Sequence, residues 1–475
     1  MIEPAADYNF ARLLATRDEE ELEHLAHIKR FAEYLTGDAR FRAALTDAAD
    51  DIRPVLQAHG LDLDPEQIRP LFDARYSHCR FENGDPRWPD AQLWDSFISD
   101  KLRYRNALRD LGATVATNAR FEAWRERQMR RCASELGIHS DAIVHALVSY
   151  ELSAGCSVGC WFCGISAERF AGYLPYSDEN RDLWRGVINA MAERFGTALG
   201  TGFCYWATDP TDNPDYLEFL KDHHAATGIV PQTTTAAPLK NVALTRRVLE
   251  HSARYPTTIN RFSILTTPIL RRVFAEFTPR ELLGVELVMQ QKDAFLPKSA
   301  AGRAATNKAA RASDAPATIA CVTGFLINMV SRQIRLVSPV RSCEQWPNGF
   351  RVFAEKSFQD TESFGAAIDT MVAEVAVNEF HPRDIVRFRS DLAIAATSDG
   401  FVANGRGGKQ TYRHARIGRQ LGELLREGRY TFSEVMDQLG GSDRPDFDII
   451  GEVQSLLDHG LLDDSTMSLC GVKSA

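Results

Sequence analysis

Strand-like and helix-like segments alternate along residues 145–330, and this alternation limits the fold more than any other feature of the chain. Short apolar runs typical of strands include HALVSYEL, TTINRFSIL and LLGVELVMQQ. Between the first two, apolar residues recur at helical spacing in SDENRDLWRGVINAMAERFG and NVALTRRVLEHSARY. Strands that alternate with helices of this length form parallel βαβ units. About six such units predict a partial or full α/β barrel.

Two further strands are predicted at residues 199–207, LGTGFCYWA, and at residues 229–236, IVPQTTTA. Helices are predicted for PDYLEFLKDHHAATG, which lies between these strands, and for TPILRRVFAEFT. In barrels of parallel strands the active-site residues lie at the carboxyl ends of the strands. The residues that follow each predicted strand are therefore the first candidates for function.

Three cysteines, Cys156, Cys160 and Cys163, follow the strand HALVSYEL within eight positions, while the other six cysteines of the chain are dispersed. A structural zinc site normally has four protein ligands, and no second cysteine or histidine pair is ready to complete one. Buried core cysteines are another alternative, but the glycines between these three make a poor core segment. A four-iron cluster normally binds four thiolates, so three cysteines would leave one iron open to a small ligand.

The composition limits the class of protein. The 475 residues suggest two to four domains, at about 150 residues per domain. Hydrophobic residues at 44% and charged residues at 25% are typical of a soluble globular protein, and the formal charge of −9 argues against nucleic-acid binding. We see no signal peptide and no apolar stretch long enough to span a membrane, so we expect a cytoplasmic protein without a membrane partner. Nine cysteines in a reducing compartment argue against a disulfide framework.

The spacing Cys-x3-Cys-x2-Cys, with Phe162 just before the last cysteine, resembles the signature of the radical S-adenosylmethionine superfamily. The resemblance implies a [4Fe-4S] cluster on Cys156, Cys160 and Cys163, with S-adenosyl-L-methionine on the open iron. Reductive cleavage would then yield a 5′-deoxyadenosyl radical, and a low-potential electron donor would be a partner. The implied fold is a partial (β/α)6-type barrel, within the α/β class.

The resemblance also assigns residues to the second cofactor. Thr208 and Asp209 occupy the place where many members have Gly-Gly-Glu before a proline, so they would hold the methionyl amino group. The alternative is that Asp209 and Pro210 simply form a turn. Thr234 would contact the ribose, and Arg261 or Ser263 would reach the cofactor, together with Phe162 beside the cluster. Threonines in a strand are otherwise ordinary β-formers.

Residues 145–355 further resemble the proteusin-type maturases, which convert L-residues of ribosomally made peptides to D-residues. The likeness is carried by ELSAGCSVGCWFCGIS, GFCYWATDPTDNPDY, PQTTTAAPLKN, NRFSIL and IACVTGFLINMV. It implies a peptide epimerase whose partner is a precursor peptide with a leader and a core. Two alternatives stay open: a radical maturase that crosslinks or otherwise modifies a peptide or small molecule, and a redox-responsive regulator.

Epimerisation needs a thiol that returns hydrogen to the opposite face of the substrate carbon. Cys343 follows a predicted strand in a loop with two prolines and a glycine, on what should be the active face, so we expect it to be the donor. Cys321 is the second choice, because a cysteine inside an apolar strand is most often a small buried hydrophobe, as is Cys204.

The flanking segments predict separate domains. Residues 1–140 are expected to form a helical domain, residues 141–380 the barrel, and residues 385–468 a winged helix. The third resembles the PqqD-type element that binds a leader peptide as an added strand. A purely structural winged helix is the alternative. Residues 296–317 carry Lys298, Arg303, Lys308 and Arg311 without an acid among these four, which predicts a solvated loop or a lid.

Overall fold

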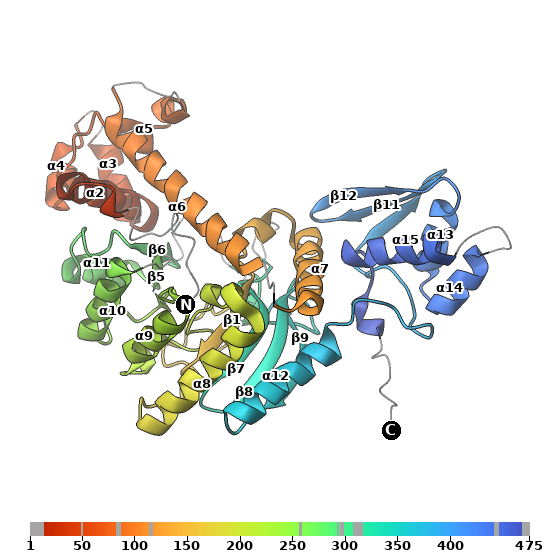
Figure 1. The fold of residues 1–475 in the computed structure, drawn as a ribbon. Helices are drawn as coiled ribbons and strands as arrows, with labels where there is room; N and C mark the ends of the chain where they lie inside the picture. Colours follow the sequence, from red (N-terminus) through yellow and green to blue (C-terminus); the bar gives the residue numbers. More distant parts are fainter. Residues whose placement is uncertain are drawn as a thin grey trace.

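The computed structural model describes residues 14–48, 51–81, 87–113, 117–255, 259–291, 294, 299–306, 317–440 and 446–467. Figure 1 shows three regions in chain order: helices near the N-terminus, a central region of strands and helices, and a smaller C-terminal unit of strands and helices. Among the helices in these ranges, none is long and apolar enough to cross a membrane.

The first region is helical, as predicted. Its elements are α2 (Glu19–Gly37), α3 (Ala39–Asp47), α4 (Arg53–Ala58), α5 (Arg69–Phe72), η1 (Ala74–Phe81), α6 (Pro89–Ala113), α7 (Ala119–Leu136) and η2 (Gly137–Ala142). Within LDLDPEQIRPLF, residues 61–72, the α-helix is confined to Arg69–Phe72. Pro70 lies in its first turn, where a residue without an N–H to donate is tolerated.

The central region contains two larger sheets and a short two-stranded pair of β2 (Ser153–Ala154) with β3 (Gly172–Tyr173). Figure 1 shows the larger sheets. In the first sheet, β1 (Ala146–Glu151) pairs in parallel with β7 (Val322–Asn328), and β8 (Gln333–Pro339) and β9 (Phe350–Ser357) follow antiparallel. In the second sheet, β4 (Thr234–Thr235), β5 (Asn260–Ile264) and β6 (Val285–Met289) are all parallel. A parallel bridge from Ser149 to Phe203 adds a short segment beside β1. Within the described ranges these strands do not close into a barrel.

Most predicted elements of this region are confirmed. The helices are α8 (Asp178–Phe195), α9 (Tyr216–Thr227), α10 (Val242–Arg254), α11 (Thr267–Glu276) and α12 (Thr361–Val375). Ser177 caps α8, and its side chain accepts a hydrogen bond from the Asn180 N–H. Two predicted strands are largely wrong. Residues 199–207 contain the end of η3 (Gly196–Thr201) and one bridge at Phe203, and residues 229–236 form only β4 and an isolated bridge at Val230. Glycines in the first segment and Pro231 in the second weaken strand pairing.

Helices pack on the outer faces of both sheets. Trp124 of α7 and Trp184 of α8 belong to the buried cluster around Phe325 of β7. A second cluster joins the N-terminal helices to β5 and β6. Gly37 at the end of α2 lies so close to this sheet that an added Cβ would be 2.7 Å from the sulfur of Met289. The N-terminal helices therefore share a hydrophobic core with the second sheet.

The C-terminal unit has three strands followed by three helices, the order expected from the sequence. The strands β10 (Ala393–Ala396), β11 (Gly400–Gly405) and β12 (Gly408–Arg413) form an antiparallel sheet. A turn at Asp399-Gly400 joins β10 to β11, and the Thr397 N–H donates to the Gly400 carbonyl there at 2.9 Å. The helical elements are α13 (Gly418–Glu427), α14 (Phe432–Leu439), α15 (Asp446–Asp458) and the short η7 (Asp464–Thr466).

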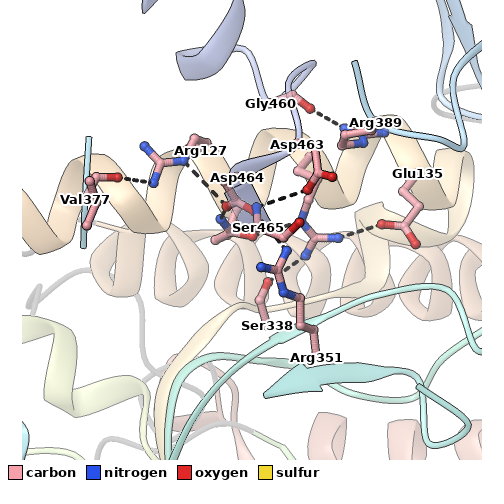
Figure 2. Close-up of polar contacts among 12 residues, drawn as sticks. Arg127, Glu135, Ser338, Arg351, Val377, Arg389, Gly460, Asp463, Asp464 and Ser465 are labelled. Carbon is pink, nitrogen blue, oxygen red and sulfur yellow. Dashed lines mark hydrogen bonds and ion pairs between the residues drawn. The ribbon is translucent and has the colours of Figure 1, made fainter. Parts of the chain in front are cut away.

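Helix α7 joins the C-terminal unit to the central sheet, as Figure 2 shows. Asp464 accepts hydrogen bonds from Gln128 of α7 at 2.6 Å and from Arg351 of β9 at 2.8 Å. Arg131 of α7 donates to the carbonyl of Pro339 at the end of β8, at 2.6 Å. Because Asp464 and Arg131 are both buried, the C-terminal unit is fastened to the central region and not loosely tethered.

Candidate functional site

The three-cysteine loop begins after β1 and returns through β3 (Gly172–Tyr173), which pairs with β2 (Ser153–Ala154). Its path depends on glycine at one position: Gly155 has φ +72°, and an added Cβ would lie 2.3 Å from the carbonyl oxygen of Arg169. Gly159 also has a positive φ of +64°, but no atom lies within 4 Å of an added Cβ there. The loop is therefore tightly fixed at its base and bordered by open space at its centre.

The three thiols are half-buried and lie close to one another. Burial raises the pKa of Cys156 to about 11, and burial together with the neighbouring Cys156 and Cys163 raises the pKa of Cys160 to about 12. Backbone N–H groups point at the sulfurs: those of Val158 and Gly159 reach Cys156, and that of Ala167 donates to Cys163 Sγ at 3.3 Å.

This donor set fits an iron–sulfur cluster. Thiolates with backbone hydrogen bonds to sulfur are the protein's usual contribution to such clusters. Thiols with raised pKa values become ligands when the metal itself displaces their protons. In the part of the chain that the structure describes, no three His, Cys, Asp or Glu side chains are gathered around one point as they would be for a single metal ion.

Asp212, which the sequence reasoning did not single out, fastens the cysteine loop from one side. Its carboxylate is fully buried and accepts from the Ser157 N–H at 2.9 Å and from the Ser157 hydroxyl. Lys240, 44% exposed, pairs with the same carboxylate and donates to the Ser157 hydroxyl at 3.1 Å. Ser157 lies between Cys156 and Cys160, so this contact fixes the centre of the loop.

Arg303 fastens the loop from the other side. Its N–H donates to the Cys163 carbonyl at 2.9 Å, and its guanidinium donates to the carbonyls of Cys160, at 3.2 Å, and of Ala167. Residues 296–317 were predicted to form a solvated loop or a lid. Arg303, which belongs to this segment, instead holds the backbone of the cysteine loop. Lys298, Lys308 and Arg311 lie outside the described residues.

Asp209 faces the cysteine loop, where its charge raises the pKa values of Cys156 and Cys160. Its own oxygens already accept hydrogen bonds from Thr211, from the Thr235 hydroxyl at 2.8 Å and from the Ala236 N–H at 2.8 Å. Burial raises the pKa of Asp209. The side chain therefore ties the end of the second strand segment to β4, a role that the sequence did not predict.

The other predicted cofactor residues lie in the cysteine loop, beside Asp209, and on β4 and β5. Thr208, beside Asp209, is half-buried, and the ring of Phe162 makes an edge contact with Trp161 at 5.5 Å between centroids. On β5, Arg261 and Ser263 are half-buried while the alternate residues are buried against the helices. Arg261 and Ser263 therefore lie on the same inner face of the sheet. Thr234 of β4 pairs in register with Arg261.

A cavity of about 220 Å³ lies at the opposite, amino ends of these strands, beneath α6. Its polar lining consists chiefly of Lys101, Arg105, Tyr205, Gln232, Arg261 and Glu286, and Cys321 also lines it. Glu286 binds Arg261 at 2.9 Å and Lys101 at 3.1 Å. Burial alone would raise the pKa of Glu286, but these two cations lower it to about 2. Glu286 is therefore ionised at neutral pH.

The two candidate hydrogen donors lie in different surroundings. Cys321, just before β7, lines the cavity, and burial raises its pKa to about 11. Cys343 is exposed in the loop between β8 and β9. Because β8 runs antiparallel to β7, this loop lies beside the start of β7 and not at the carboxyl ends of the parallel strands. The same loop contacts the segment before Arg303, because the Gly302 N–H donates to the Pro347 carbonyl at 2.7 Å.

Among curated proteins, the chain is similar to the uncharacterized protein y4wI of Sinorhizobium fredii, with 44% identity over 430 residues. The aligned region covers 88% of this chain and 83% of y4wI. No family model matches the chain, and no solved structure matches it. Identity of this extent over nearly the whole length shows common descent, and the chain belongs to the same protein family as y4wI.

Proposed function

We propose that the chain is a radical S-adenosylmethionine enzyme that inverts residues of a ribosomally made peptide from the L to the D configuration. The observation that carries the proposal is the loop after β1, in which three neighbouring thiols accept backbone hydrogen bonds and border open space. Cys156, Cys160 and Cys163 would hold a [4Fe-4S] cluster there. Bound with S-adenosyl-L-methionine, that group supplies a radical able to take a hydrogen atom from carbon.

The residues around the loop would keep it rigid during the reaction. Asp212 and Arg303 bind its backbone from two sides, so the spacing of the thiols would not change on binding. Asp209 fixes the neighbouring segment against β4. Preorganisation of this kind lowers the cost of reaching a reactive geometry. Thr208, half-buried and adjacent to Asp209, would supply a hydroxyl for the methionyl group.

Cys321 supports the choice of epimerisation among radical reactions. Inversion needs a hydrogen atom from the face opposite to the one attacked, and Cys321 is a thiol that lines a cavity large enough to admit a side chain. Its raised pKa keeps the S–H bond intact at neutral pH. Transfer of that hydrogen atom leaves a sulfur radical, which an electron from the low-potential donor and a proton from solvent would restore to the thiol.

A leader peptide would bind at the C-terminal unit. Strand β12 pairs with β11 on one side, and its residues are largely exposed. Within the described ranges no strand pairs with its other edge. An extended peptide could add there through backbone hydrogen bonds, as PqqD-type elements bind leaders.

Anaerobic reconstitution with iron and sulfide tests the class of enzyme. We expect a four-iron absorption and paramagnetic spectrum, and release of 5′-deoxyadenosine when dithionite is added. A reconstituted protein that never cleaves S-adenosyl-L-methionine under these conditions would contradict the proposal.

Deuterated water tests the reaction on a candidate precursor peptide. Wild-type enzyme should place one deuterium on each inverted residue, since a thiol exchanges its proton with solvent. Cys321→Ala should still form 5′-deoxyadenosine but yield no D-residues, and Cys343→Ala serves as the matched control. Inversion by Cys321→Ala but not by Cys343→Ala would reassign the donor to Cys343. Modified peptide without solvent deuterium would favour the non-epimerising maturase.

A further inference from the structure

The cavity beneath α6 has an unbalanced charge. Among the described residues, three cationic side chains, Lys101, Arg105 and Arg261, line it together with one carboxylate, that of Glu286. Glu286 is shared between Lys101 and Arg261. Arg105 donates to the amide oxygen of Asn106 at 3.2 Å, and no carboxylate of the described residues forms an ion pair with it. Two positive charges are therefore in excess at this cavity.

The rest of the lining is largely apolar. Side chains of Ile98 and Leu102 from α6, Ile229 before β4 and Ile259 before β5 contribute to the walls. Cations beside apolar walls attract a carboxylate more strongly than cations in open water, because screening by solvent is weaker there. Guanidinium groups also match carboxylates geometrically, since they can donate two parallel hydrogen bonds.

We propose that this cavity binds a carboxylate on a short apolar stem, as in a glutamate side chain, with Arg105 as its main partner. Lys101 and Arg261 add attraction from the wall, and the apolar residues receive the methylene groups. The assignment of this carboxylate to a residue of the substrate peptide, next to Cys321, rests on the proposed function. The binding of a carboxylate in the cavity does not depend on the cluster.

The test is a titration of the full chain, without a cluster, monitored by calorimetry. The probes are N-acetyl-L-glutamate methylamide and its glutamine counterpart, which has the same shape without the charge. A charge-assisted hydrogen bond of about 1.5–3 kcal/mol predicts that the acid binds about 10- to 100-fold more tightly than the amide. Glutarate is a third probe: tighter binding of glutarate than of the glutamyl probe would identify a free acid as the ligand, and the reverse a peptide.

Variants locate the binding. Arg105→Gln should lose most of the preference for the acid, whereas Arg105→Lys keeps the charge and should retain part of it. Arg429→Gln, an exposed arginine of the C-terminal unit, is the control and should bind as wild type does. Should Arg105→Gln fail to fold, Glu286→Gln replaces it, and removal of that competing carboxylate should tighten binding of the acid.

Three results would overturn the proposal: equal affinity for the acid and the amide, no effect of either cavity variant, or displacement of the acid by S-adenosyl-L-methionine. The last would mean that the cations serve the cofactor's own carboxylate. None of these depends on enzyme activity. Failure of the binding and failure of the proposed reaction can thus be told apart.

Discussion

The two ends of the central strands differ in how their polar groups are used. At the carboxyl ends, Asp209, Asp212 and Arg303 form hydrogen bonds with the backbone and side chains of adjoining loops. At the amino ends, cations outnumber carboxylates among the described residues, and Arg105 donates to the neutral amide of Asn106. A polar group that is fully paired stabilises one loop conformation, whereas a group with spare capacity can bind something else. The first end is suited to holding a reactive group in place, and the second to receiving a ligand.

The largest effect is expected from loss of a thiol at the carboxyl ends. Cys156→Ala should lose the cluster and all cleavage of S-adenosyl-L-methionine, because two thiols cannot hold what three do. Iron and sulfide contents after anaerobic reconstitution measure this. Cys204→Ala is the matched control, since Cys204 is buried in the neighbouring segment outside the loop. A full cluster in Cys156→Ala would show that this thiol is not a ligand, and the carboxyl ends would then not be the place that holds the reactive group.

Asp212→Ala should loosen the loop without removing a ligand. It deletes two hydrogen bonds to Ser157, at a cost of about 1–3 kcal/mol in local stability. We expect the reconstituted cluster to be lost to a chelator about tenfold faster. Lys240→Gln should have a smaller effect, because Lys240 is largely solvated and contacts the backbone only through Asp212 and Ser157. Equal chelation rates in Asp212→Ala and wild type would show that the loop does not need this contact.

At the amino ends, Glu286→Gln should change how the free energy of unfolding depends on pH. The folded pKa of Glu286, about 2, lies below its ordinary value, so ionised Glu286 stabilises the fold above that ordinary value. Because the group is about one-third exposed, we expect a difference in unfolding free energy of about 1–2 kcal/mol at pH 7. The difference should shrink as the pH falls below about 4.5 toward 2. Urea unfolding at several pH values measures it, and a constant difference would mean that charge is not its cause.

Gly460→Ala lies away from both ends and should change stability alone. Gly460 has φ +68°, and an added Cβ would lie 2.8 Å from the Arg131 nitrogen, so we expect destabilisation of about 1 kcal/mol or more. Gly451→Ala within α15 meets no atom within 4 Å and should stabilise by about 0.5–1 kcal/mol. Neither variant should alter cluster content or acid binding. A change in either would show that the two ends are coupled through the C-terminal unit.

Features with a local cause could be predicted from the sequence. The apolar spacing of α8 and the apolar run of β1 are encoded in adjacent residues, and both elements formed as expected. The hydrogen bonds from Ser157 of the cysteine loop to Asp212 could not be found in this way, because the two residues are 55 positions apart. The cavity depends on Lys101 and Glu286, which are 185 residues apart. The placement of Cys343 was missed for a related reason: the antiparallel direction of β8 is set by strand pairing, which single-chain patterns do not show.

The attachment of the C-terminal unit to α7 has a consequence for synthesis of the chain. Gln128 and Asp464 are 336 residues apart, yet the Gln128 side chain donates a part-buried hydrogen bond to the Asp464 carboxylate. During translation α7 emerges early, and its polar face toward the C-terminal unit stays uncovered until residues 460–466 have left the ribosome. Contacts between such distant residues form slowly. The last step of folding should therefore be the arrival of this segment, and nascent chains stalled before it should be markedly more sensitive to protease within α7 than the finished protein.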